Sequence, residues 1–227
     1  RLFHQLLVTF LLSIGFVANP SDTCVMYLSV GVDFALLAIY VDDLLLFTTT
    51  LELADEITAK LKSKFNCVDL GEITWCLGMR ITTSADRHTI TLDLEQYMKT
   101  IVARYEFEEL QSVPTPMLHD LKLTKEDCPT TDEAKEAMRV YPFRSAISSL
   151  MFAMVAMRAD LSYVVTCIAR FSANPGLPHW NALVRVYQYV KGTADLKLTY
   201  SRMADTPAPL LYGYSDADWA TTDIDER

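Results

Sequence analysis

The sequence FALLAIYVDDLLLF, residues 34–47, sets two adjacent carboxylates, Asp42 and Asp43, between two strongly apolar runs. Apolar runs of this length, separated by a short polar break, predict a β-hairpin with strands at 34–40 and 44–47. Two interpretations of the acidic pair stay open at this point. Aspartate is a common turn residue, and a solvated pair costs little there. Hard oxygen ligands on a rigid hairpin also suit Mg²⁺, which binds one or two carboxylates together with waters and substrate phosphates.

The residues on either side of the hairpin predict a mixed order of helices and strands. Helical spacing of apolar residues predicts a helix over residues 1–16, and a third apolar run predicts a strand at 24–30. After the hairpin, Thr49 precedes Glu52 by three positions, a capping-box pattern that predicts the start of an amphipathic helix. The apolar residues of this helix recur every fourth position: Leu53, Ile57, Leu61 and Phe65.

The second half of the chain predicts another hairpin and then a run of helices. Apolar and β-branched residues predict strands at 74–83 and 89–92, and Asp93 is placed to cap a helix that reaches residue 105. The polar residues 118–135, which follow Pro114 and Pro116, favour a linker. The remaining elements expected are helices at 142–157, 161–172 and 178–191, and strands at 196–200 and 210–215.

These elements together predict the α+β fold class. Gly192 stands where a left-handed residue would end the helix at 178–191. The pair His179-Trp180 at the start of that helix could stack on a nucleic-acid base, but a buried histidine beside a buried tryptophan is favoured.

The composition excludes several classes of protein. With 51% hydrophobic residues, seven glycines and nine prolines, the chain is neither collagen-like nor disordered. The most apolar stretch, residues 6–18, is shorter than the roughly 20 residues of a membrane-spanning helix, so we expect a soluble, intracellular chain with no membrane partner. Five cysteines and four histidines lack the spacings of a disulfide framework or a zinc site.

The net charge of −9 argues against a nucleic-acid partner, but the charge is unevenly distributed. Between residues 141 and 200, six basic residues stand against only two acidic ones, Asp160 and Asp195. This segment is either a surface that contacts phosphates or an ordinary solvated helix face. Charge alone favours the solvated face.

Short motifs along the whole chain occur in the order found in one known family. The YVDD hairpin, residues 40–43, resembles the polymerase signature of reverse transcriptases. The other motifs are, in order, DLGE (69–72), LGM (77–79), VPTPM (113–117), FRSAISSLM (143–151), HW (179–180), YVKGT (189–193) and GYSDADWA (213–220). As an ordered set they resemble the copia-type branch of LTR retrotransposon Pol polyproteins over nearly all 227 residues.

The resemblance implies an RNA-directed DNA polymerase that extends a primer with dNTPs on an RNA or DNA template. Asp42 would be the main catalytic, metal-binding carboxylate and Asp43 its weaker companion, with Mg²⁺ as the cofactor and Mn²⁺ as a substitute. Tyr40 and Val41 would approach the incoming nucleotide and the primer end. Residues 70–79 would complete the palm and form the turn that grips the primer. Two metal ions would activate the primer 3′-hydroxyl and neutralise the leaving pyrophosphate.

The same resemblance implies a succession of domains. They would be a partial palm (1–92), a thumb start (93–117), a linker (118–137), a helical thumb and connection region (138–200) and an incomplete ribonuclease H start (201–227). The basic residues of the helical region are the candidate contacts to nucleic acid: Arg144, Arg170, Arg185 and Lys191. Asp216 would be the first metal-binding carboxylate of the ribonuclease H site.

Two departures from the family pattern carry expectations of their own. The third palm carboxylate of the family lies on a strand upstream of Arg1, and the later ribonuclease H carboxylates lie beyond Arg227. We therefore expect this chain alone to extend primers poorly and to self-associate through exposed palm surfaces. The alternative is a non-enzymatic remnant that binds nucleic acid or protein weakly. The location implied by the family is the cytoplasm, within virus-like particles.

Overall fold

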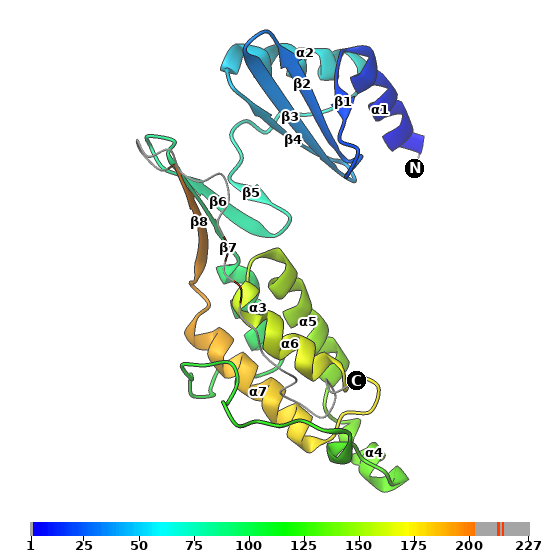
Figure 1. Ribbon diagram of the computed structural model, residues 1–227, viewed down its shortest axis with the longest axis vertical. Coiled ribbons are helices and arrows are strands. Elements are labelled where there is room, and N and C mark those ends of the chain that lie inside the picture. The colour runs from blue at the N-terminus through cyan, green and yellow to red at the C-terminus, as the bar shows by residue number, and fades with distance from the viewer. Residues whose placement is uncertain (1, 203–212, 214, 216–227) are drawn as a thin grey trace. The chain divides into compact units, whose positions relative to one another are not determined.

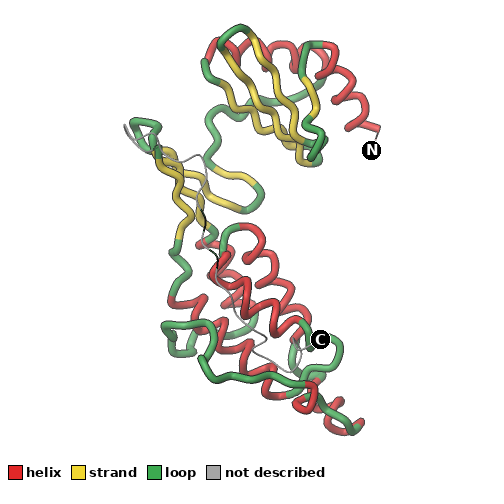
Figure 2. The backbone as a smooth tube through the Cα atoms, in the orientation of Figure 1, coloured by secondary structure: helices red, strands yellow, loops and turns green. Residues whose placement is uncertain are grey.

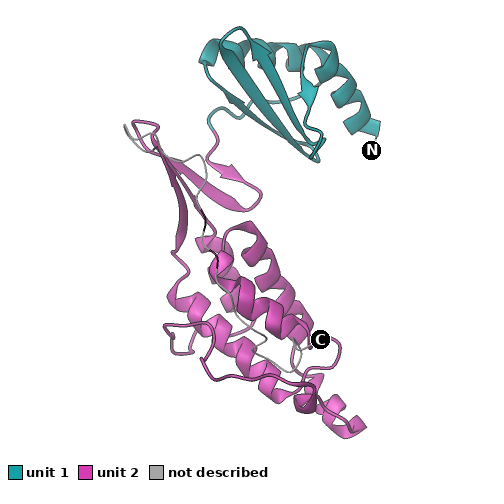
Figure 3. Ribbon diagram, in the orientation of Figure 1, with its two compact units in different colours: residues 1–72 teal, residues 73–227 magenta. Residues whose placement is uncertain are grey.

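The computed structural model describes residues 2–202, 213 and 215. The chain divides into two compact units, unit 1 over Arg1–Glu72 and unit 2 over Ile73–Arg227 (Figure 3). The predicted strand at 210–215 and the candidate carboxylate Asp216 lie outside the described residues. Among the described residues, no helix is both long and apolar enough to cross a membrane.

Unit 1 is a four-stranded antiparallel sheet with helices on one face (Figure 1). The strands lie in the order β1-β2-β3-β4, so each strand neighbours the next one along the chain. The elements are α1 (Leu2–Ser13), β1 (Val17–Ala18), β2 (Val25–Val30), β3 (Asp33–Tyr40), β4 (Asp43–Thr48) and α2 (Leu51–Lys64). The strands predicted at 24–30, 34–40 and 44–47 are confirmed within one residue at each end.

The core of unit 1 lies between one face of the sheet and the two helices. In β3, Ala35, Leu37 and Ile39 are buried, whereas Phe34 and Tyr40 on the opposite face are exposed. This alternation follows from the two-residue period of a strand. The helices add the other buried apolar side chains of the same cluster, among them Leu7 and Leu11 from α1 and Leu53, Ile57 and Leu61 from α2.

The start of α2 differs from the predicted capping box by one residue. Thr50 is the N-cap, and its side chain accepts a hydrogen bond from the Leu53 amide at 3.3 Å. Thr49 instead donates its hydroxyl to Asp33 Oδ1 at 2.9 Å and accepts the Phe34 amide at 3.1 Å. Either of the two adjacent threonines could cap the helix. Because Thr49 is bonded to Asp33 and Phe34 at the start of β3, Thr50 is the one that caps it. Thr49 therefore ties the β4 end to the start of β3.

Unit 2 joins a second four-stranded antiparallel sheet, in the order β5-β6-β7-β8, to a bundle of helices (Figure 2). Its first elements are β5 (Trp75–Cys76), β6 (Met79–Thr83), β7 (Thr89–Asp93) and α3 (Glu95–Arg104). The helices that follow are α4 (Asp132–Met138), α5 (Phe143–Ala156), α6 (Ser162–Ala169) and α7 (Leu177–Gly192), with short 3-10 turns at Lys125–Asp127 and Ala159–Leu161. The final strand is β8 (Lys197–Ser201).

Strand β8 completes the second sheet by returning to β7. It pairs antiparallel with β7, with Thr89 opposite Ser201 and Asp93 opposite Lys197. The Arg202 amide extends this pairing by donating to the His88 carbonyl at 2.7 Å. The strand itself was predicted from the sequence, but its partner, about a hundred residues away, was not.

One hydrophobic core unites α3 with α5, α6 and α7. Its fully buried members include Met98, Leu150, Ile168 and Tyr187, one from each helix. The polar segment predicted as a linker packs on the same core. Leu123 is a buried member of it, and Leu121, Cys128 and the preceding Met117 are partly buried against it. Residues 118–137 therefore lie within one compact unit and do not separate two. The division between units falls at residue 72.

The end of α7 packs closely against the segment that follows α3. Gly192 is the last residue of the helix, and its φ is not in the left-handed region predicted for it. A Cβ on Gly192 would lie 2.9 Å from Ser112 Cβ, closer than two carbon atoms pack. The absence of a side chain, and not backbone freedom, is what this position requires.

His179 is a fully buried residue in the first turn of α7. Its Nδ1 accepts a hydrogen bond from the Gly176 amide at 2.9 Å, and its ring stacks on Phe171 at 3.9 Å between centroids. The neighbouring Trp180 packs against Phe107 and Tyr141. These contacts support the favoured interpretation of the His179-Trp180 pair as structural and not as a platform for bases.

The burial of His179 predicts that unit 2 loses stability as the pH falls below about 6.5. Burial lowers the pKa of His179, and the opposing effects of Asp127 and the Thr124 carbonyl do not reverse this. His179 then binds a proton more readily in the unfolded chain than in the folded chain. The contribution of the buried neutral ring to folding stability is therefore present above the unfolded-state pKa and is lost as the pH falls below it. Urea unfolding at pH 7.5 and 5.5 should show the loss.

Two variants test whether His179 is responsible. His179→Gln, which cannot titrate, should flatten the difference between the two pH values even though the variant is less stable at both. His88→Gln changes an exposed histidine in the 84–88 loop and should leave the difference as it is in the wild type. An unchanged pH dependence in His179→Gln would contradict this assignment.

Candidate active site

The YVDD hairpin is formed by two paired strands and a two-residue turn. Tyr40 and Asp43 are the last pair of the β3–β4 ladder, so the turn consists of Val41 and Asp42. Asp43 is therefore the first residue of β4 and not part of the break predicted at 41–43. Ile39 is buried behind the turn and Leu44 packs with it, which anchors the hairpin to the core of unit 1.

Val41 holds an unusual backbone conformation at the tip of this turn. Its φ is 53°, a left-handed value that side chains branched at Cβ rarely adopt. Such a conformation costs on the order of 1–3 kcal/mol and persists only where the surrounding structure imposes it. Here the ladder on either side fixes the turn. Strain of this kind concentrates at functional sites, and the adjacent Asp42 is the candidate functional group.

All four residues of the YVDD motif are exposed to solvent. Val41 has 73% of its surface exposed, and Asp42, Asp43 and Tyr40 are exposed as well. As a ladder pair, Tyr40 and Asp43 lie on the same face of the sheet, the face opposite the helices. Both carboxylates are thus accessible to ions and to a polymer substrate in the described structure.

The donor set of this site fits Mg²⁺ but is limited to two carboxylates. Asp42 and Asp43 offer hard oxygen ligands, and Mg²⁺ in proteins is often held by one or two carboxylates with waters and substrate phosphates. Among residues 2–202, 213 and 215, no group of three or more His, Cys, Asp or Glu side chains is placed to hold a metal ion. The described residues therefore bring together the first two carboxylates and no third.

Beside this acidic pair, β4 presents an unpaired edge. Within the described part of unit 1, β4 pairs with β3 on one side only, and β1 lies at the other end of the sheet. The main-chain amides and carbonyls along the open side of β4 are available to a further strand. Such a strand would run directly beside Asp43.

The four basic residues proposed from the sequence lie in unit 2, and three of them donate hydrogen bonds within it. Arg144 Nε donates to the Ser172 carbonyl at 2.7 Å, and Arg185 Nη2 donates to Thr115 Oγ1 at 3.0 Å. Lys191 Nζ donates to the carbonyls of Glu108 and Leu110. Arg170 is an exposed residue that also has an interaction within the chain. These bonds brace the loops of unit 2, and the role of the four in binding nucleic acid stays a prediction.

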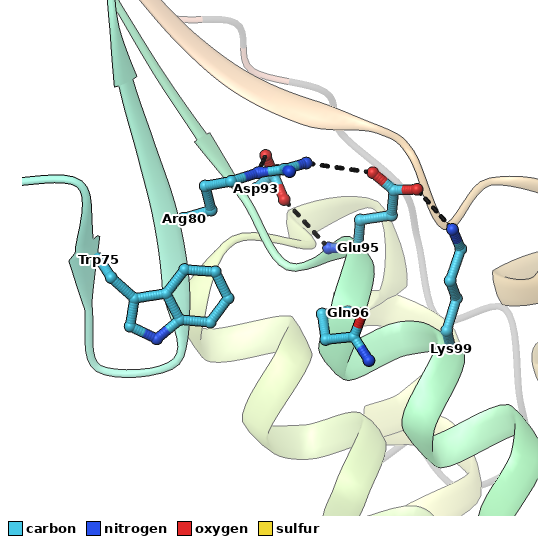
Figure 4. Close-up of a pocket in the computed structure, with 6 residues that line it drawn as sticks. All are labelled: Trp75, Arg80, Asp93, Glu95, Gln96 and Lys99. Atoms are coloured by element: carbon cyan, nitrogen blue, oxygen red, sulfur yellow. Dashed lines mark hydrogen bonds and ion pairs between the residues drawn. The ribbon is translucent and has the colours of Figure 1, made fainter.

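A second polar group in unit 2 was not found from the sequence. Arg80, Asp93, Glu95 and Lys99 form a chain of ion pairs beside the exposed indole of Trp75 (Figure 4). With Gln96 they line a shallow cavity of about 320 Å³. No single sequence motif predicts this cluster as a whole, because its members come from three elements, β6, β7 and α3, that come together only in the folded unit.

Comparison with known proteins now decides the family. A family profile described as reverse transcriptase (RNA-dependent DNA polymerase) matches residues 1–119, which include the whole YVDD hairpin. The chain belongs to the reverse transcriptase family. The match covers unit 1, the second hairpin and α3.

Pol polyproteins of copia-type retrotransposons are similar to this chain over 97% or more of its length. The chain is 34% identical to the retrovirus-related Pol polyprotein from transposon TNT 1-94 of Nicotiana tabacum, over 100% of the chain and 17% of the relative. It is 30% identical to the Pol polyproteins from transposons RE2 and RE1 of Arabidopsis thaliana, over 97% of the chain and 14% of each relative. These relatives confirm the resemblance drawn from the motifs.

The chain spans between 14% and 17% of the length of these polyproteins. No solved structure matches it. The comparisons therefore establish a reverse transcriptase region of a copia-type Pol polyprotein.

Proposed function

We propose that this chain supplies the catalytic hairpin of a polymerase that extends a primer with dNTPs on an RNA or DNA template. The observation that carries the proposal is the exposed Val41-Asp42 turn, anchored on buried strands, in a chain of the reverse transcriptase family. Asp42 is the principal catalytic carboxylate and Asp43 its companion. Reverse transcriptases generally use divalent metal ions, and Mg²⁺ fits this donor set.

The residues of the hairpin divide the work between holding charge and positioning the substrate. Asp42 and Asp43 hold the metal ion with their carboxylate oxygens at the rigid end of the ladder. Bound Mg²⁺ would supply positive charge that acidifies the primer 3′-hydroxyl and neutralises the triphosphate. The Tyr40 phenol, beside Asp43 on the open face of the sheet, and the exposed Val41 side chain contact the sugar and base of the primer end and the incoming nucleotide.

A third carboxylate reaches this site from residues outside the described chain. The open edge of β4 supports the proposal, because a strand added there would pair directly beside Asp43. Two divalent ions bound close together would repel each other, and a third carboxylate would supply the further negative charge that holds both of them.

The two units correspond to parts of the polymerase hand. We assign unit 1 to the palm and the helices α3 to α7 to the thumb. The β5–β6 turn, Leu77-Gly78, is the turn that contacts the primer. Both residues have left-handed φ values, 50° and 79°, which a two-residue hairpin turn with a right-handed strand twist requires. The exposed apolar side chains of unit 1 support the expectation that the isolated chain self-associates, and a second copy is one partner for that face.

The dependence on a metal ion tests the proposal directly. The test protein is the reverse transcriptase region that joins this chain to the residues encoded upstream of Arg1, incubated with a primer annealed to an RNA template. Removing divalent ions with a chelator should abolish nucleotide addition, and added Mg²⁺ should restore it. Binding of the primer–template, followed by fluorescence anisotropy at low salt, should persist in the chelator. Extension that continues without divalent ions would contradict the proposed site.

A further inference from the structure

Three side chains form a row across the second sheet. Trp75 in β5 is directly opposite Arg80 in β6, and Arg80 is directly opposite Asp93 in β7. Directly paired residues project from the same face of an antiparallel sheet. Lys197 of β8, opposite Asp93, extends the row. The row lies at the end of the sheet where β7 leads into α3, because Asp93 is two residues before Glu95, the first residue of that helix.

Arg80 bonds to two carboxylates from two different elements. Its Nε lies 2.9 Å from Asp93 Oδ2 at the end of β7, and its Nη2 lies 3.2 Å from Glu95 Oε2 in the first turn of α3 (Figure 4). Lys99 Nζ lies 2.6 Å from the other oxygen of Glu95. The result is a continuous chain of ion pairs from Asp93 in β7, through Arg80 in β6, to Glu95 and Lys99 in α3.

Asp93 is the buried centre of this cluster. Only 4% of its surface is exposed, and its second oxygen accepts the Glu95 amide at 3.4 Å. A buried carboxylate is costly unless it is paired and hydrogen-bonded, and Arg80 is the partner that meets this need. The sequence predicted that Asp93 caps the following helix, but the N-cap of α3 is Leu94, which makes no side-chain cap bond. Asp93 ends β7 instead, and its role is to accept from Arg80 and from the Glu95 amide.

The electrostatics of the outer members agree with this geometry. The hydrogen bond and charge of Asp93 raise the pKa of Arg80 above its usual value. The hydrogen bond and charge of Lys99, followed by the charge of Arg80, lower the pKa of Glu95. Both shifts favour the charged forms of Arg80 and Glu95, the two groups that join the sheet to α3.

The short strand β5 is held by its two-residue ladder to β6 and by the burial of Cys76. It contributes two residues to the sheet, Trp75 and Cys76, and the turn Leu77-Gly78 leads straight to β6. More than half of the Trp75 surface is exposed, so hydrophobic burial holds this residue weakly. Arg80 is opposite Trp75 and is the residue through which this hairpin is bonded to α3.

We propose that Arg80 is a positioning residue that fixes the β5–β6 turn relative to the first helix of the thumb. The structural part of this inference stands alone, and its meaning for polymerisation rests on the proposed function, which puts the primer at that turn. The planar guanidinium donates to both carboxylates in directions that a lysine ammonium cannot reproduce together. A change in the direction of α3 would therefore reach the turn through the Arg80 side chain, in addition to the β6–β7 ladder.

Hydrogen exchange of the 227-residue chain tests the structural part. Arg80→Met keeps the length of the side chain and removes its charge. We expect the amides of residues 75–83 to exchange about tenfold faster, while the slowest amides of α5, α6 and α7 keep their rates. Arg80→Lys should restore only part of the protection. Arg139→Met, which breaks an exposed pair with Glu136, is the matched control and should change neither region.

Two outcomes would overturn the structural part. Equal acceleration throughout unit 2 would show that Arg80 contributes only to global stability. Unchanged exchange at residues 75–83 would show that the ladder and the turn hold the hairpin without it.

Asp93→Asn, which keeps the shape of the carboxylate but not its charge, should reproduce the local acceleration of Arg80→Met and add little to it in the double variant.

Primer-extension kinetics test the functional part in the reverse transcriptase region that includes the upstream residues. Arg80→Met should raise KM for the primer–template several-fold with a smaller change in KM for dNTP, because the primer end is displaced while the metal site is intact. If the wild-type region has no Mg²⁺-dependent activity, the proposed function fails and the exchange result is unaffected. If it is active and Arg80→Met leaves both KM values unchanged, the positioning role fails and the proposed function stands.

Discussion

Asp42→Asn is expected to slow single-nucleotide addition by about 10³-fold or more in the reverse transcriptase region that includes the residues upstream of Arg1. The amide has nearly the same shape, so the turn and the β3–β4 ladder should form as before. It lacks the negative charge that holds a divalent ion, and the loss of several kcal/mol of stabilisation of the transition state corresponds to this factor. Rapid-quench measurement of one dNTP addition, with enzyme in excess over primer, isolates the chemical step.

The neighbouring carboxylates provide graded controls for this prediction. Asp43→Asn should cost less than Asp42→Asn, because Asp43 is the companion ligand at the start of β4. Asp55→Asn makes the same chemical change at an exposed position of α2 and should leave the rate within twofold of the wild type. Retention of more than a tenth of the wild-type rate by Asp42→Asn would refute the assignment of this residue.

Arg158→Met is expected to destabilise unit 2 by about 3 kcal/mol. Only 3% of the Arg158 surface is exposed, and its guanidinium forms two bonds to Asp160, at 2.7 Å from Nη2 and 2.9 Å from Nε. It also donates from Nη1 to the Thr193 carbonyl at 3.0 Å, at the end of α7. The apolar replacement leaves this carbonyl without its Arg158 donor, and it leaves Asp160 with the hydrogen bond from the Tyr189 hydroxyl. Exchange of the slowest amides in α5 to α7 measures the change in the free energy of unfolding.

Arg139→Met is the matched control for burial. Arg139 pairs with Glu136 at 2.7 Å, a distance equal to the Arg158–Asp160 contact, but both side chains are mostly exposed. Solvent-exposed ion pairs contribute 1 kcal/mol or less, so this change should have no effect beyond about that amount. Similar losses in the two variants would contradict the view that burial makes the Arg158 pair important.

The Arg158 prediction also has a pH dependence with a definite sign. Burial tends to raise the pKa of Asp160, but the hydrogen bonds and charge of Arg158, together with the Tyr189 hydroxyl, outweigh it and lower the pKa. The stabilisation is therefore present at neutral pH and is lost as the pH falls through the folded-state pKa, below about 4. Arg158→Met should show a weaker loss in this acid range, which is separate from the range below 6.5 assigned to His179.

The parts of the fold that the sequence predicts well are those set by local pattern. The hairpin strands around Asp42 follow from two apolar runs with a short polar break between them, and α2 follows from its four-residue repeat. The choice of Thr50 over Thr49 as its cap did not follow, because it depends on Asp33, which lies sixteen residues earlier. The polar segment 118–137 has no helical period, so its attachment to the core through Leu123 was invisible in the sequence.

The candidate site shows the same division between local and distant information. Asp42 and Asp43 are neighbours in the chain, so the pair was predictable from six residues. Arg80 and its partners Asp93 and Glu95 are thirteen and fifteen residues apart, and only the strand register and the start of α3 bring them together. The bonds of Arg144 and Lys191 to main-chain carbonyls were likewise hidden, because net charge records neither direction nor partner.

The pairing of β8 with β7 holds the chain at Arg202 against the second sheet. The attachment point is held beside the 84–88 loop, at the sheet end of unit 2 and away from the helix tips. If the five residues of β8 separated from β7, the unpaired segment that leads to Arg202 would be longer by roughly 17 Å, at about 3.3 Å per residue. How far the residues after Arg202 can lie from the second sheet therefore depends on whether this strand ladder is formed.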